Sequence, residues 1–177
     1  ILLMEKKDKE IYKGLSDTDA LTGLFNRRAF QAAVDETLLK RISGVFIFID
    51  VDNFKDYNDK YGHANGDLCL KHFAAAMKKC FPKDSILGRY GGDEFVVYIK
   101  NAASDDAHRY MDEFQREISH LIMSGGEHVT VSASAGGVAF IGGGEDFVSL
   151  CRSADNMLYD VKRNGKGTFK IKGAKNM

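Results

Sequence analysis

The sequence predicts an α+β fold, an α/β-type sandwich in which helices flank a central mixed sheet. Segments with the hydrophobic period of helices alternate with β-prone runs in the order β-α-α-β-β-α-β-α-β. A Gly-Gly pair followed by two acids separates two of these runs, as in a hairpin, where we expect the glycines to supply positive φ angles. Without one inserted helix and the last helix–strand pair, the order resembles the ferredoxin-like β-α-β-β-α-β core.

The length of 177 residues suits one domain with a substantial core. Lys plus Arg equals Asp plus Glu, so the net charge of zero favours neither nucleic acid nor a membrane as partner. No apolar run approaches the roughly 20 residues of a membrane span, and no signal peptide is visible. Cys69, Cys80 and Cys151 form no CxxC pair, which predicts structural thiols in a reducing compartment.

Residues 1–16 are charged, with scattered apolar positions, and we expect the end of a connecting helix there. They are either a frayed terminus or the tail of a coiled coil from an upstream region. Because the chain begins at Ile1, we expect a piece of a longer protein, with one domain over residues 17–177.

The first elements of that domain are a helix and a strand. Asp19–Arg28 is turn-rich and leads into the helix, for which Asn26 is the expected N-cap. The buried stripe of this helix has a spacing of four and consists of Phe30, Val34, Leu38 and Ile42. After Ser43-Gly44, the run Val45–Ile49 is apolar on both faces, which predicts a central strand covered on both sides.

The remaining elements are predicted from hydrophobic periodicity and from the glycine and proline residues that end helices and strands. They are a helix at 53–61, a loop at 62–67, a helix at 67–81, the hairpin around Gly91-Gly92, a helix at 104–123, a strand at 129–135 that 137–141 extends beyond a bulge, a helix at 146–163 and a strand at 168–171.

Acidic residues follow the central strand and the Gly-Gly pair. Asp93 and Glu94 repel each other at the tip of the hairpin, and a divalent metal is a natural cation to offset this repulsion. Asp52 can cap the following helix, but Asp50 has no helix to cap and needs a metal or a cationic partner. If the hairpin lies beside the central strand, Asp50 and Asp93 converge at one sheet edge.

A metal held by Asp50, the Val51 carbonyl, Asp93 and Glu94 favours a nucleoside triphosphate substrate. Magnesium is usually bound by one or two carboxylates together with substrate phosphates. Lys55 can face phosphate oxygens, and Lys162 and Lys166 can add charge from the other side. Taken singly, each lysine can also be a solvated surface residue.

A guanine-reading pair is also available. Guanine offers two adjacent donors that one carboxylate, such as Asp67, can accept, and the amide of Asn58 can complement the remaining polar edge. The alternatives are that Asp67 caps its helix and that Asn58 is an exposed polar residue. His63 is either a hydrogen-bonding loop residue or a contact to ribose or base.

Four motifs carry a resemblance to a known family. Gly91–Phe95 (GGDEF) resembles the name-giving motif of the GGDEF family, the diguanylate cyclases. Asp19–Arg28 is similar to the family's DxLTxLxNRR, Asp50–Asp67 to its DxDxFKxxNDxxGHxxGD, and Tyr159–Gly165 to its YxxKxxG. Together these ordered motifs reach from residue 19 to about 171.

The resemblance implies a palm-like nucleotide cyclase fold and the condensation of two GTP into cyclic di-GMP and pyrophosphate. It implies two Mg²⁺ (or Mn²⁺) on Asp50, Val51 and Asp93, with Glu94 as a further ligand. Asp93 or Glu94 would help to deprotonate the ribose 3′-OH, and Lys55 would stabilise charge on the phosphates. The substrate-binding residues that it implies are Phe54, Asn58, His63, Asp67, Gly91, Gly92, Lys162 and Lys166.

The resemblance also implies a homodimer, because one site binds one GTP. Residues 1–16 would control dimerisation for an upstream sensory domain, and the fragment would be cytoplasmic, as part of a larger and membrane-anchored sensor. Where many members carry an RxxD product-inhibition site, this chain has Pro82 and Ser85, so we expect that site to be missing. The alternatives are a catalytically silent GTP- or cyclic di-GMP-binding regulatory module and a cyclase with another product; the retained acids favour the enzyme.

Overall fold

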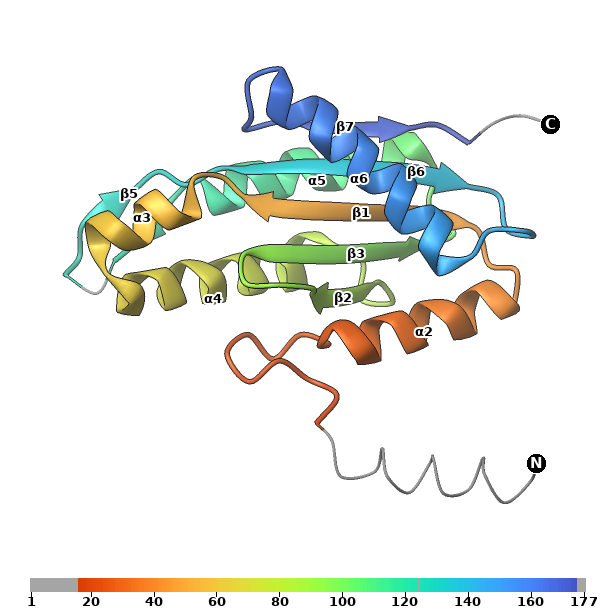
Figure 1. Ribbon diagram of the computed structural model, residues 1–177, viewed down its shortest axis with the longest axis horizontal. Coiled ribbons are helices and arrows are strands. Elements are labelled where there is room, and N and C mark those ends of the chain that lie inside the picture. Colours follow the sequence, from red (N-terminus) through yellow and green to blue (C-terminus); the bar gives the residue numbers. More distant parts are fainter. Residues whose placement is uncertain (1–15, 124, 175–177) are drawn as a thin grey trace.

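The computed structural model describes residues 16–123 and 125–174, so the expectations for residues 1–15 lie outside the described residues. A five-stranded sheet forms the centre, in the strand order β2-β3-β1-β6-β7 (Figure 1). Its strands are β1 (Gly44–Val51), β2 (Ile86–Arg89), β3 (Glu94–Lys100), β6 (Ala133–Phe140) and β7 (Phe169–Lys172). Neighbours are antiparallel except for the parallel pair β6 and β7, which confirms the predicted mixed sheet.

Helices cover both faces of this sheet (Figure 1). α2 (Arg27–Leu39) and α6 (Phe147–Arg163) pack on one face, and α4 (His63–Cys80) and α5 (Ser104–Ile118) pack on the other. β1 alternates between the two layers, with Phe46 in the cluster of α2 and α6 and Ile47 in that of α4 and α5. Both side chains are fully buried, which confirms that Val45–Ile49 lies in a central strand.

α2 and α6 begin where the sequence predicts. The Asn26 carboxamide oxygen accepts a hydrogen bond from the Ala29 N–H at 3.0 Å, so the expected N-cap is confirmed. Asp146 caps α6 by accepting from the Ser149 N–H at 2.7 Å. α2 ends at Leu39, and Arg41 has a left-handed φ of 55°. Ile42 therefore lies outside the helix that was expected to include it.

The short helix α3 (Phe54–Tyr61) lies at the end of β1 and runs almost directly into α4. Only Gly62, with φ 82°, separates the two helices, so the predicted loop at 62–67 is wrong. α4 begins one turn earlier than the predicted helix at 67–81, and this additional turn packs closely against α3. Gly66 is buried and approaches Asn58 so closely that a Cβ would overlap the amide oxygen.

Two further differences lie between α5 and β6. α5 ends at Ile118, and the next apolar residues form a small hairpin of β4 (Leu121–Ile122) and β5 (His128–Val129). The strand β6 then pairs with β1 in unbroken register, so the predicted bulge is absent from this stretch. Gly136 permits the close approach of α6 to this strand, because a Cβ there would overlap the backbone of α6. No helix in the described chain is long and apolar enough to cross a membrane.

Candidate functional site

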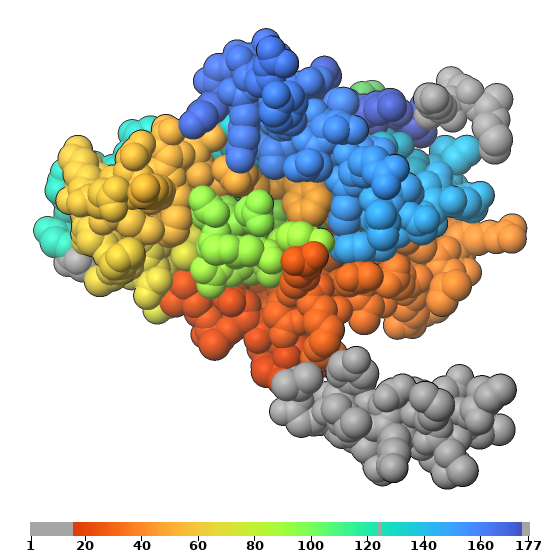
Figure 2. Space-filling model, viewed as in Figure 1, coloured from red at the N-terminus to blue at the C-terminus, as the bar shows by residue number. Residues whose placement is uncertain are grey.

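The hairpin turn lies beside the end of β1. Asp50 pairs in register with Glu94, and the Val51 N–H donates to the Asp93 carbonyl at 3.1 Å. Figure 2 shows the hairpin (green) at the surface between α3 (gold) and α6 (blue). The predicted convergence of Asp50 with the acids of the hairpin is therefore observed.

The carboxylates gathered here destabilise one another's charge. Burial raises the pKa of Asp50, and Asp93 and Asp52 raise it further, although the Lys162 ammonium 2.9 Å from Asp50 opposes the shift. Burial raises the pKa of Glu94 too, and the charges of Asp50 and Asp93 add to it. The site thus holds more negative charge than one lysine balances, which favours a bound cation.

Asp50→Asn is expected to raise the melting temperature of the metal-free protein at neutral pH. The pKa of Asp50 lies above its ordinary value of 3.8 in the folded chain, so the contribution of this group to stability is greatest at low pH and is lost as the pH rises through the folded pKa. The gain from the amide should therefore shrink on acidification. Thermal unfolding of the unmodified chain and of Asp50→Asn, with a metal chelator and at neutral and acid pH, measures this difference in melting temperature. A lower melting temperature for the variant at neutral pH would contradict the prediction.

The donor set suits a hard divalent cation that arrives with phosphates. Among the described residues, no three His, Cys, Asp or Glu side chains are placed to hold a metal ion by themselves. Magnesium needs fewer protein ligands than that, because water and substrate phosphates complete its octahedron. Asp50 and Glu94, paired across the strands with raised pKa values, are the kind of oxygen donors it takes.

Asp52 does not cap α3, so that interpretation is wrong. The N-cap position belongs to Asn53, which has a left-handed φ of 53° and no side-chain cap bond. The Asp52 carboxylate turns instead toward β6, where it accepts from the hydroxyls of Ser132 and Ser134 at 2.7 and 2.6 Å. It also accepts from the Gly167 N–H at 3.0 Å.

Three lysines approach the end of β1 from two sides. Lys55 is exposed in the first turn of α3. Lys162, in the last turn of α6, binds Asp50, and Lys166 beyond it donates to the Asn53 amide oxygen at 2.8 Å. The structure therefore brings all three lysines predicted from the sequence to one region, with both α6-side lysines bonded to residues of the β1–α3 junction.

The predicted guanine-reading residues lie where α3 meets α4. The Asn58 Oδ1 atom is buried and has no hydrogen-bond partner among the described residues. Such an atom costs free energy, which a ligand donor could offset once the amide turns away from Gly66. Asp67 is exposed in the second turn of α4, so the alternative that it caps this helix is wrong. His63 is exposed at the start of α4, and the half-buried Phe54 ring stacks on Tyr57.

The Gly-Gly turn is held by an arginine that sequence reasoning missed. Arg89 donates to the Gly92 carbonyl at 2.7 and 3.1 Å and to both carboxylate oxygens of Asp19 at 3.1 and 3.2 Å. Its place directly before the turn was the available signal. Neither Gly91 nor Gly92 has a positive φ, contrary to the expectation for this turn. A Cβ at Gly91 would overlap the end of the Glu94 side chain, so this carboxylate would have to shift if Gly91 carried a side chain.

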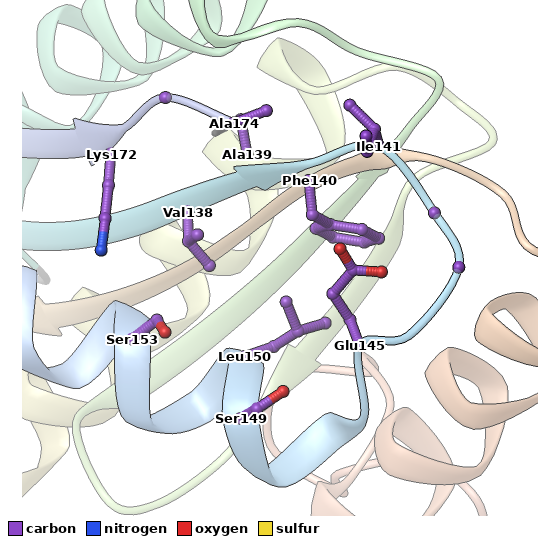
Figure 3. A pocket seen from close by; sticks show the side chains of 13 residues that line it. Val138, Ala139, Phe140, Ile141, Glu145, Ser149, Leu150, Ser153, Lys172 and Ala174 are labelled. Atoms are coloured by element: carbon purple, nitrogen blue, oxygen red, sulfur yellow. The ribbon is translucent and has the colours of Figure 1, made fainter. Parts of the chain in front are cut away.

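A cavity of about 320 Å³ lies away from these acids (Figure 3). It is lined by the Val138–Gly143 end of β6 and by α6 residues such as Leu150. Phe140, in this lining, pairs with Gly44 at the opposite end of β1 from Asp50. The cavity is therefore separate from the acidic site.

Comparisons with known proteins agree with these motifs. The sequence model described as "Diguanylate cyclase, GGDEF domain" matches residues 16–168. The chain is 33% identical to the cyclic di-GMP phosphodiesterase PdeR of Escherichia coli over 93% of its own length and 25% of that protein. It is 31% identical to the diguanylate cyclase DgcM of E. coli, over 92% of the chain and 40% of DgcM.

Solved structures agree as well. The GGDEF domain of TpbB (YfiN) from Pseudomonas aeruginosa superposes with a TM-score of 0.81 at 30% identity, covering 87% of this chain and 93% of that domain. The chain spans a quarter to a half of the length of the curated relatives it matches.

Proposed function

The chain belongs to the GGDEF family of diguanylate cyclase domains, and from this premise we propose that it condenses two GTP molecules into cyclic di-GMP with release of pyrophosphate. The family and its palm-like cyclase fold, expected from the motifs, are confirmed. One observation carries the proposal of activity: the register that sets Asp50 beside Glu94 and joins Val51 to Asp93.

Each site residue has a part in this proposal. Asp50, the Val51 carbonyl, Asp93 and Glu94 would hold two Mg²⁺ or Mn²⁺ ions, which would supply Lewis acidity at the α-phosphate and charge for the leaving pyrophosphate. The raised pKa of Glu94 suits a group that accepts the 3′-OH proton, alone or with Asp93. The lysines neutralise phosphate charge. The residues that bind base and ribose are Phe54, Asn58, His63 and Asp67.

We further propose a homodimer, since one site holds one GTP and two must meet to form the cyclic product. The surrounding chain would bring two domains together, under an upstream sensory region, and raise their effective concentration. All three cysteines are free thiols, which suits a reducing compartment, and we place the domain in the cytoplasm.

A catalytically silent regulatory module is the second candidate. The match to PdeR, which is named a phosphodiesterase and of which this chain covers only a quarter, favours it. The assembled acids favour the enzyme over a module that binds cyclic di-GMP without a metal, because such a binder has no need of mutually repelling carboxylates.

Incubation of the purified chain with GTP and Mg²⁺ separates the two candidates. We expect chromatography to resolve cyclic di-GMP, and the rate per molecule to rise with protein concentration because a dimer is needed. Binding of GTP or cyclic di-GMP without turnover would support the silent module. Pyrophosphate release without a cyclic dinucleotide would contradict the cyclase proposal.

Gly66→Ala is expected to raise the KM for GTP about tenfold, since a displaced Asn58 forfeits one or two hydrogen bonds to the base. The preference for GTP over ATP should shrink in parallel. Gly173→Ala is the control, because no atom lies within 4 Å of the added Cβ. An unchanged KM and an unchanged GTP preference in Gly66→Ala would remove Asn58 from the base site.

No product-inhibition site is expected at Pro82–Ser85. The Ser85 N–H bonds the Pro82 carbonyl at 3.0 Å in a tight turn that offers neither a guanidinium nor a carboxylate at these two positions. Calorimetric titration with cyclic di-GMP, with the active site saturated by a non-hydrolysable GTP analogue, should show no binding. Micromolar binding that a Ser85 substitution abolishes would contradict this prediction.

A further inference from the structure

Three segments far apart in sequence meet at the end of β1, and one carboxylate joins them. We propose that Asp52 is a positioning residue that holds the turn carrying Lys166 against the β1–α3 junction, and thereby sets this lysine for the triphosphate. The inference deepens the proposed function and rests on it. Asp52 itself touches neither substrate nor metal in this role.

The contacts of Asp52 use its whole carboxylate. Oδ1 accepts from the Ser134 hydroxyl at 2.6 Å, and Oδ2 accepts from the Ser132 hydroxyl at 2.7 Å and from the Gly167 N–H at 3.0 Å. Ser134 is fully buried, and its hydroxyl oxygen also accepts from Gly167 at 3.2 Å. The Asp52 N–H bonds the Ser132 carbonyl at 2.9 Å. The Asp52 side chain thus links the turn after α6 to the residue that follows β1 and to the start of β6, and the bond from Gly167 to Ser134 adds a direct link to β6.

The two turns that Asp52 joins are both conformationally demanding. Asn53 and Lys166 have left-handed φ angles of 53° and 58°, and Gly165 and Gly167 flank Lys166 with φ of 126° and 64°. Non-glycine residues hold such angles only where the surrounding structure imposes them. The Lys166 ammonium crosses from one turn to the other and donates to Asn53 at 2.8 Å.

Loss of the Asp52 carboxylate should therefore displace Lys166. The Gly167 N–H would lose one of its two acceptors, and the flexible Lys166 side chain would be left as the link between the turn at 164–167 and the β1–α3 junction. Lys162 would keep its place better, because it lies inside α6 and binds Asp50 independently. Loss of the carboxylate should thus weaken binding of the phosphates that Lys166 contacts and should leave binding of the base at α3 and α4 unchanged.

A double-mutant cycle with two ligands tests the inference. Binding of guanosine, which has no phosphate, and of GTP with Mg²⁺ is measured for the unmodified chain, Asp52→Ala, Lys166→Ala and the double variant. Asp52→Ala should weaken GTP binding about tenfold, the size of one charged contact, and should leave guanosine binding unchanged. In the Asp52→Ala background, Lys166→Ala should weaken GTP binding further by less than about twofold, because Asp52 and Lys166 act as one unit.

Three further variants complete the design. Asp52→Asn keeps one acceptor oxygen and should restore part of the GTP affinity. Ser132→Ala removes one donor with little risk to folding and should show a smaller loss, again for GTP alone. Asp146→Ala, which removes the cap of α6 far from the acids, should lower stability without changing the ratio of the two affinities.

The outcomes are distinguishable. Equal weakening of GTP and guanosine by Asp52→Ala would mean a merely structural role and would overturn the inference. Additive losses in the cycle would overturn it too, since Asp52 would not act through Lys166. If the unmodified chain bound GTP no better than guanosine, the proposed function itself would fail, and this inference with it.

Discussion

Asp93→Asn is expected to lower the rate of cyclic di-GMP formation at least about 100-fold while leaving the fold intact. Asp93 lies at the tip of the hairpin, with its carbonyl bonded to Val51, and its carboxylate would bind the catalytic ions. A metal ion stabilises transition-state charge by several kcal/mol, and each 1.36 kcal/mol is a factor of ten in rate. The amide is nearly isosteric but binds Mg²⁺ poorly, so the loss should appear mainly in kcat.

Asp84→Asn is the matched control, because Asp84 is an exposed acid in the turn before β2. It should retain full activity. Initial rates and thermal unfolding of both variants should be measured together, so that loss of activity is separated from loss of fold. Activity of Asp93→Asn within a few fold of the unmodified chain would remove this residue from the metal site and would weaken the cyclase proposal.

Gly136→Ala is expected to lower the free energy of unfolding by about 3 kcal/mol, at the upper end of the usual cost of overpacking. The added Cβ would overlap the Leu158 N and Ala154 O atoms of α6, and backbone atoms cannot swing aside as a side chain can. The helix must move off the sheet instead. Urea denaturation should show the lower midpoint, and activity should fall as well, because α6 carries Lys162.

Gly137→Ala is the natural comparison, since the neighbouring residue faces the other side of the sheet. A Cβ there would lie 3.1 Å from an Ile47 side-chain atom, 3.2 Å from the Phe46 carbonyl oxygen and 3.3 Å from an Ile171 side-chain atom, all farther than the 2.1 and 2.3 Å backbone contacts at Gly136. Its cost should be about 1 kcal/mol. Equal unfolding midpoints for the two variants would show that the contact between β6 and α6 is looser than the structure describes.

Hydrophobic period and turn chemistry were sufficient to predict β1, β7, the hairpin of β2 and β3, and α6, whereas the predicted start and bulge of β6 are wrong. They also predicted the convergence of Asp50 with Asp93, because a hairpin beside a buried strand leaves few places for its tip. The ends of helices were harder to predict. The apolar residues Leu121 and Ile122 continue the stripe of α5, and over so short a run a helical period and a strand look alike. Only the pairing of β4 with β5 decides between them.

The role of Asp52 could not be predicted from the sequence. A short acid before a helix is equally compatible with an N-cap and with a long-range acceptor. Its partners Ser134 and Gly167 lie 82 and 115 residues away, and no local pattern marks them. For the same reason the pairing of Arg89 with Asp19, separated by 70 residues, was missed. The sequence shows which residues carry chemistry better than it shows which residues hold them in place.

The strand order has a consequence for folding of the chain during its synthesis. β1 lies in the middle of the sheet, yet it is made before both of its neighbours, β3 and β6. Both edges of β1 stay open until β3 has emerged, roughly fifty residues later, and one edge stays open until β6 has emerged, roughly ninety residues later. A nascent chain interrupted before β6 would display that strand to other chains, so premature termination should yield aggregates rather than a smaller working domain.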